Sequence, residues 1–123
     1  VEVDDNRLRV CQEEIFGPFV TIQRVPDADA AIRIANDSAF GLVSYIWSND
    51  LLEVTQMSGA IKAGTVWVNT PLARDLRAPF GGYKQSGVGR DGLESSVELL
   101  TEEKTVMFPT SRLDLPKLGL GDG

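Results

Sequence analysis

The sequence predicts an α/β fold in which a largely parallel sheet is covered by helices on both faces, giving three layers. Between residues 19 and 68, strand-like apolar runs alternate with stretches whose apolar residues recur at helical spacing. The runs at 42–47 and 65–68 are almost continuously apolar, which is typical of strands buried on both faces. A ferredoxin-like α+β layout is the alternative, and its strands would be buried on one face only.

The first part of the chain contains a strand and a capped helix. Residues up to Gln12 alternate polar and apolar types and fit either an edge strand or an arm. Residues 19–25 alternate well enough for a strand, which Pro26 ends. Asp27 is then placed to cap a helix over 28–36, because apolar side chains recur there on one helical face.

The middle of the chain repeats this order. The apolar run 42–47 predicts a second strand. Asp50 and Glu53 follow at the spacing of a capping box and begin a helix, which Gly64 stops before a third strand over 65–68. Because parallel strands need a crossover connection of about a dozen residues or more, helices of this length favour a parallel sheet.

Residues 69–90 are predicted to form a long, shaped loop without sheet, because prolines remove backbone donors and glycines admit positive φ. The loop follows the carboxyl end of a strand, which is the edge where open α/β sheets bind ligands. Gly87 to Gly92 fits the spacing G-x-G-x-x-G, but no strand runs directly into Gly87. We therefore interpret this motif as a loop that feeds a short helix over 93–100.

The last strand candidate is 104–108, which Pro109 ends. It lies far past the predicted core, so we expect it to pair with a separate sheet in a partner subunit. The chain is accordingly expected to divide into a body at 1–100, an association strand at 101–109 and a C-terminal arm at 110–123.

Composition argues against several classes of function. The net charge of −6, without a dense run of Lys and Arg, argues against binding to nucleic acid. No apolar stretch approaches the roughly 20 residues that span a bilayer, and the first residues lack the pattern of a signal peptide, so we expect a soluble, cytoplasmic protein. Histidine is absent from the 123 residues, which excludes a Ser-His-Asp triad or a His-ligated zinc site within this chain.

Several polar residues are candidates for a site, and each has two interpretations. Glu14, beside a Gly-Pro turn, is either a functional group, as an acceptor for sugar hydroxyls or a carboxylate near a reacting centre, or a carboxylate of a turn or helix end. Arg74 and Arg77 flank Asp75, and they either hold a substrate carboxylate or pair with Asp75 to fix the loop. Cys11 is interpreted as structural rather than nucleophilic, because no histidine is available to activate it.

A set of short motifs occurs in a fixed order along the chain: EEIFGP at 13–18, Asn36 with FGL at 40–42, GTVWVN at 64–69, PFGGYK at 79–84, SG at 86–87 and GR at 89–90. Together they resemble the C-terminal part of the aldehyde dehydrogenases. The resemblance extends over about residues 1–108, and it implies that the predicted sheet is part of that family's catalytic domain.

The resemblance implies roles for individual residues. It places Glu14 on the nicotinamide ribose hydroxyls, Phe16 beside the nicotinamide ring and Phe80 in the pocket for a small-molecule aldehyde. It implies NAD as the cofactor, with NADP possible, and an oligomerisation strand at 105–108 in a homodimer or homotetramer. The family's nucleophilic cysteine, general-base glutamate and oxyanion asparagine all precede this segment, so Cys11 is not expected to be catalytic and the chain alone is expected to be inactive.

The substrate class follows from two further similarities. The sequence RDLR at 74–77 is similar to the hydroxymuconic semialdehyde dehydrogenases, and LPKLG at 115–119 to the 5-carboxymethyl-2-hydroxymuconic semialdehyde enzymes of aromatic catabolism. Those substrates carry carboxylates, so Arg74 is the expected carboxylate partner and Arg77 the second choice. Betaine-aldehyde enzymes share much of the loop, but Arg74 would repel their cationic substrate. A stand-alone association module without catalysis is the hypothesis from a different class.

Overall fold

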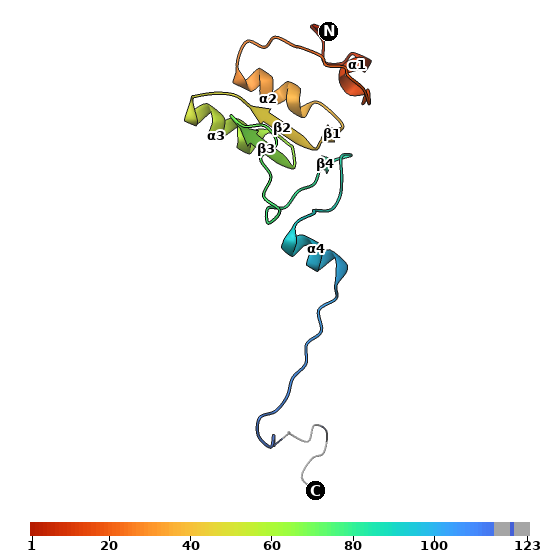
Figure 1. Cartoon of the computed structure of the whole chain (residues 1–123), viewed down its shortest axis with the longest axis vertical. Helices are drawn as coiled ribbons and strands as arrows, with labels where there is room; N and C mark the ends of the chain where they lie inside the picture. The colour runs from red at the N-terminus through yellow and green to blue at the C-terminus, as the bar shows by residue number, and fades with distance from the viewer. Residues whose placement is uncertain (115–118, 120–123) are drawn as a thin grey trace.

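The computed structural model describes residues 1–114 and residue 119. Its central unit is a pair of parallel strands, β2 (Val43–Ile46) and β3 (Thr65–Val68), connected through the helix α3 (Leu51–Ala60). A second helix, α2 (Ala28–Asn36), packs against α3 (Figure 1). The strands predicted at 42–47 and 65–68 and the helices predicted on either side of the first of them are present, and the parallel direction of the two strands is confirmed.

The two strands pair in register from Val43 with Thr65 to Ile46 with Val68. Ile46 is buried, while the residue before it, Tyr45, points to the opposite face of the sheet. There its ring stacks on that of Trp67, and Tyr45 is 41% exposed. The predicted cover on both faces, and with it the three-layer arrangement, is not seen in the described residues.

A second, smaller sheet joins the loop to the body of the protein. In it β1 (Phe40–Gly41) pairs antiparallel with β4 (Tyr83–Lys84). The prediction that the loop contains no sheet was therefore wrong for these residues. The strand β4 is only two residues long, so it fits among the glycines of the loop. The ammonium group of Lys84 stabilises it by donating to the carbonyl oxygens of Asn36 and Ser38, each at 2.8 Å.

The beginning of the chain is less regular than predicted. Residues 9–12 form the short helix α1 (Arg9–Gln12). The strand predicted at 19–25 was wrong, because only Ile22 pairs there, in a single parallel bridge with Glu2. Alternation of apolar side chains predicts a strand only where a neighbouring strand is long enough to continue the ladder, and the segment around Glu2 pairs at one position.

Carboxylate caps begin both helices, as predicted. Asp27 accepts a hydrogen bond from the backbone N–H of Ala30 at 2.7 Å, and Asp50 accepts one from Glu53 at 3.1 Å. The capping box is completed indirectly. The hydroxyl of Ser48 donates to the Glu53 carboxylate at 2.6 Å and accepts from the backbone N–H of Asp50 at 3.1 Å.

The loop after β3 lies directly on the backbone at the start of that strand. A Cβ added to Gly64 would overlap the carbonyl oxygen of Gly81, and one added to Gly82 would lie 2.5 Å from the Cβ of Ser86. Only glycine allows the chain to approach this closely, and Gly82 is accordingly buried. The two adjacent glycines of the loop thus set its position against the sheet.

The helix predicted at 93–100 is confirmed as α4 (Leu93–Leu100). Beyond it Figure 1 shows an extended trace, in which residues 101–109 pair with no other strand of the described chain. An association strand needs a partner chain, so it stays a prediction. The LPKLG motif lies outside the described residues except for Gly119. None of the helices within the described ranges is both long and apolar enough to span a bilayer.

Replacing Gly64 by alanine is expected to lower the free energy of unfolding by about 3 kcal/mol, because the new Cβ would push the loop away from β3. Gly59→Ala is the matched control. Gly59 lies within α3 with nothing within 4 Å of an added Cβ, so alanine is expected to raise stability by about 0.5–1 kcal/mol. Urea unfolding measures both changes, and an unchanged midpoint for Gly64→Ala would contradict the close approach.

Candidate functional site

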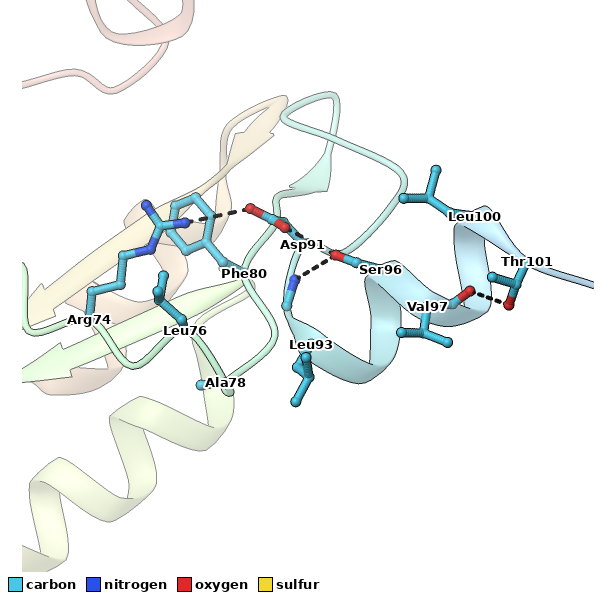
Figure 2. A pocket seen from close by; sticks show the side chains of 11 residues that line it. Arg74, Leu76, Ala78, Phe80, Asp91, Leu93, Ser96, Val97, Leu100 and Thr101 are labelled. Atoms are coloured by element: carbon cyan, nitrogen blue, oxygen red, sulfur yellow. Dashed lines mark hydrogen bonds and ion pairs between the residues drawn. The ribbon is translucent and has the colours of Figure 1, made fainter.

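A cavity of about 460 Å³ lies between the loop and α4 (Figure 2). Most of the side chains around it are apolar, and two are charged, Arg74 from the loop and Asp91 from the segment before α4. The apolar side chains come from both walls: Leu76, Ala78, Phe80, Leu93, Val97 and Leu100. Such a lining, with few polar groups, is typical of a site for a small organic ligand.

A backbone bridge fixes the relation between the two walls. The N–H of Phe80 donates to the carbonyl of Asp91 at 2.6 Å, and the N–H of Asp91 donates back at 2.7 Å. Gly92 follows with φ of 144°, a conformation that L side chains rarely adopt, and it turns the chain into α4. The hydroxyl of Ser96, in the first turn of α4, donates to the Asp91 carboxylate at 3.2 Å.

Arg74 and Phe80 meet in this cavity. The guanidinium carbon of Arg74 lies 5.3 Å from the centroid of the Phe80 ring, within the range of a cation–π contact. One guanidinium nitrogen also lies 3.5 Å from a carboxylate oxygen of Asp91, as Figure 2 shows. A guanidinium has five N–H donors, so this single long contact leaves donors for an anion that enters the cavity.

Arg77 does not line the cavity. Its Nε and Nη2 donate to the two carboxylate oxygens of Asp75 at 2.9 Å and 2.6 Å, and its backbone N–H donates to the same carboxylate at 2.9 Å. These hydrogen bonds lower the pKa of Asp75 and raise that of Arg77. For Arg77, the structure therefore matches the interpretation in which an Arg-Asp pair fixes the loop.

Glu14 lines a second cavity, of about 570 Å³, whose other walls come from Ala35, Ser38, residues 40–44, residues 61–63, Gln85 and Ser86. Within the described residues no hydrogen bond or ion pair occupies the Glu14 carboxylate. Phe16 is 96% exposed and lines neither cavity, so its ring is uncovered near the same turn. Ser86 fixes one wall by accepting from the backbone N–H of Gly41 at 2.9 Å.

Among the residues that the structure describes, Cys11 has no activating neighbour. Its Sγ lies 3.9 Å from the carbonyl oxygen of Asp5, and the side chain is half-buried. The two nearby cations are engaged elsewhere, since Arg7 pairs with Asp5 at 2.9 Å and Arg9 with Glu13 at 2.7 Å. The structure favours the interpretation of Cys11 as structural. In the part of the chain that the structure describes, no three His, Cys, Asp or Glu residues form a group that could hold a metal ion.

Asp91 is the site residue that sequence reasoning missed. It occupies a variable position within the G-x-G-x-x-G spacing, yet it is the carboxylate that faces Arg74. The sequence signal that could have indicated Asp91 is an acidic residue two positions before a predicted helix, after a loop that carries arginines. That signal does not select a partner, because the contact joins two residues far apart along the chain.

Residues 1–106 match the model of the aldehyde dehydrogenase family. The chain belongs to the aldehyde dehydrogenase family. The resemblance of the sequence motifs to this family is thereby confirmed. Membership fits the α/β unit seen in the structure, and it does not by itself fix the aldehyde.

Individual relatives agree with the family match. The NADP/NAD-dependent aldehyde dehydrogenase PuuC of Escherichia coli K12 is 44% identical over 106 residues, which are 86% of this chain and 21% of PuuC. The chain therefore spans about a fifth of the length of this relative.

Two solved structures have the same fold over most of the chain. The P. syringae indole-3-acetaldehyde dehydrogenase AldA, in complex with NAD⁺ and IAA, is 42% identical with a TM-score of 0.78, covering 82% of this chain and 20% of AldA. HpcC from Thermus thermophilus is 36% identical with a TM-score of 0.83, covering 94% of this chain and 22% of HpcC.

The pair between Arg77 and Asp75 predicts a pH dependence. Because the folded-state pKa of Asp75 is lowered, the pair contributes stability above the ordinary aspartate pKa, and this is lost as the pH falls through the lowered value. Arg77→Ala is expected to move the pKa of Asp75 up part of the way toward about 3.9, since the backbone hydrogen bond remains. Titration of the Asp75 carboxyl carbon by NMR measures the shift. Arg74→Ala is the control and should leave it unchanged.

Proposed function

We propose that this chain forms the aldehyde pocket and part of the nicotinamide site of an NAD-dependent aldehyde dehydrogenase, and that the substrate is a carboxylated semialdehyde of the muconic type, as in aromatic catabolism. The observation that carries the substrate class is the Arg74 guanidinium over Phe80 in an apolar cavity. PuuC, named as NADP/NAD-dependent, and AldA, solved with NAD⁺, support the cofactor, with NADP as the second choice.

The chemistry of Arg74 favours a carboxylate. A guanidinium and a carboxylate can form two parallel hydrogen bonds, and this pair strengthens when water is excluded from the pocket. Asp91 contacts one nitrogen at 3.5 Å, so a substrate carboxylate would share the guanidinium rather than find it fully neutralised. Arg77 is the weaker candidate, because its fork of donors is already closed on Asp75.

Other aldehydes remain as the alternative substrates. A cationic aldehyde such as betaine aldehyde would meet the positive charge of Arg74 at the cavity wall, which is unfavourable. An uncharged aldehyde would use the apolar side chains from α4 and leave Arg74 without a role. AldA is named for such an apolar aldehyde, so the comparison of charged and uncharged substrates decides between the two.

The residues near Glu14 fit a nicotinamide nucleotide. An ionised carboxylate only accepts hydrogen bonds, and ribose hydroxyls are donors. The Glu14 carboxylate lines the second cavity and has no partner among the described residues, so it would hold those hydroxyls, and the exposed ring of Phe16 would cover the nicotinamide. NAD supplies the hydride acceptor. No residue of this chain is assigned a catalytic role, since Cys11 lacks a base and a free cationic neighbour.

Association of subunits is a further part of the proposal. Val106, Met107 and Phe108 are 60%, 87% and 83% exposed, and their segment pairs with no strand of the described chain. A partner strand would cover these side chains and satisfy the backbone, as an exposed strand edge favours. We propose a homo-oligomer, a dimer or a tetramer, assembled through this segment.

Arg74→Ala is expected to raise KM for succinic semialdehyde about 10- to 100-fold, the loss of one charge-assisted hydrogen-bonded pair. KM for butanal, an uncharged aldehyde of the same chain length, should change little. Steady-state kinetics on the protein as isolated from its source measures both. Arg77→Ala is the matched control and should leave the ratio of the two KM values unchanged.

Two outcomes would count against the proposal. Equal effects of Arg74→Ala on both aldehydes would remove the carboxylate assignment. No oxidation of a muconic semialdehyde or of either test aldehyde by the wild-type protein would contradict the dehydrogenase itself and favour the stand-alone association module.

Glu14→Gln is expected to raise KM for NAD about tenfold, because the amide keeps one acceptor oxygen and loses the negative charge that strengthens the hydrogen bonds to the ribose. Glu13→Gln is the control, since Glu13 pairs with Arg9 at 2.7 Å instead. Equilibrium dialysis of NAD gives the binding change independently of turnover. The assignment fails when both variants bind NAD like the wild type.

A further inference from the structure

We propose that Trp67 is a positioning residue for substrate charge, which acts through Arg74 by holding the loop that carries it. This rests on the proposed function, because it concerns the residue that would meet the substrate carboxylate. The indole N–H of Trp67 donates to the carbonyl oxygen of Ala73 at 2.6 Å, and Ala73 directly precedes Arg74. The indole therefore fixes the peptide group from which Arg74 begins.

The loop has little else to hold it at this point. Among the described residues, the bond from Trp67 is the one hydrogen bond that reaches residues 70–74. Leu72 has φ of 54°, is 71% exposed and contributes no anchor to the core. The position of the Arg74 backbone relative to the sheet thus depends on the indole.

Trp67 itself belongs to a rigid part of the molecule. It lies in β3, paired in register with Tyr45 of β2, and its ring stacks on the Tyr45 ring with centroids 5.1 Å apart. A side chain locked by a strand and by stacking is a suitable support for a residue on a loop, because its own rotamer is fixed.

The other partners of Arg74 are fixed separately. Phe80 and Asp91 are joined to each other by their two backbone hydrogen bonds, which do not involve residues 70–74. The guanidinium reaches both only when the Arg74 backbone is held at the right distance from this bridge. Loss of the indole N–H would release the near end of the loop and leave the bridge intact.

Trp67→Phe tests whether the indole N–H holds the backbone of Arg74, because phenylalanine keeps an aromatic ring for Tyr45 and removes the N–H donor. Loss of a hydrogen bond that acts only by positioning is expected to raise KM for succinic semialdehyde about fivefold. The kcat value and KM for butanal should stay unchanged. Trp47→Phe is the matched control, since Trp47 is 66% exposed and lies outside the loop and its cavity.

The double variant Trp67→Phe/Arg74→Ala separates action through Arg74 from general damage. If Trp67 acts through Arg74, the double variant has the same KM for succinic semialdehyde as Arg74→Ala alone. A further rise in the double variant, or an equal rise for butanal, would overturn the positioning role. The proposed function would still stand, because it depends on the preference of the wild type and of Arg74→Ala.

A measurement that does not depend on catalysis tests the role of Trp67 even where the proposed substrate class is wrong. The Arg74 guanidinium lies over the Phe80 ring, so a ring-current shift is expected for the Arg74 side chain in NMR spectra recorded with arginine-selective labelling. We expect the shift to be lost in Trp67→Phe and kept in Trp47→Phe, whichever aldehyde the protein oxidises. An unchanged shift in a folded Trp67→Phe variant, or an unprotected Trp67 indole N–H in the wild type, would overturn the inference.

Discussion

The close approach of the Gly81 backbone to that of Gly64 is the constraint on which the candidate site depends. It places a loop with several prolines and glycines directly on the start of β3, where no side chain fits between the loop and the strand. Gly41 obeys the same restriction against the carbonyl oxygen of Lys62. With the backbone held in this position, β4 pairs with β1, and the bridge between Phe80 and Asp91 joins the two walls of the cavity.

One side chain, Asn36, joins the elements that the two small sheets leave separate. Its amide donates to the carbonyl of Ala60 at 2.9 Å, at the end of α3, and its amide oxygen accepts from the backbone N–H of Lys62 at 2.7 Å. Its own carbonyl accepts from Lys84 in β4 at 2.8 Å. The ends of α2 and α3 and the loop strand therefore meet at one residue, which supplies the contacts that a larger sheet would otherwise provide.

The sequence predictions were correct for elements set by residues close in sequence, and wrong for elements that depend on residues far apart in sequence. The caps at Asp27 and Asp50, the two helices and the strand at 65–68 are set by neighbours in sequence, and they were predicted correctly. The wrong elements, the strand at 19–25 and the absence of sheet at 83–84, depend on partners far along the chain. Within the site, the charge of Arg74 and the size of Phe80 could be predicted from the sequence. Which carboxylate each arginine contacts could not, and the structure shows Asp91 beside Arg74 and Asp75 beside Arg77.

The anchor of the Arg74 loop is a main-chain carbonyl, and every amino acid has one. The hydrogen bond from Trp67 therefore places no restriction on the side chain at position 73 or 74. Under the proposed function, selectivity for charge and integrity of the fold are therefore separable: residue 74 can vary while the indole keeps the loop in place. A change of substrate class through residue 74 would then need no compensating change in the core.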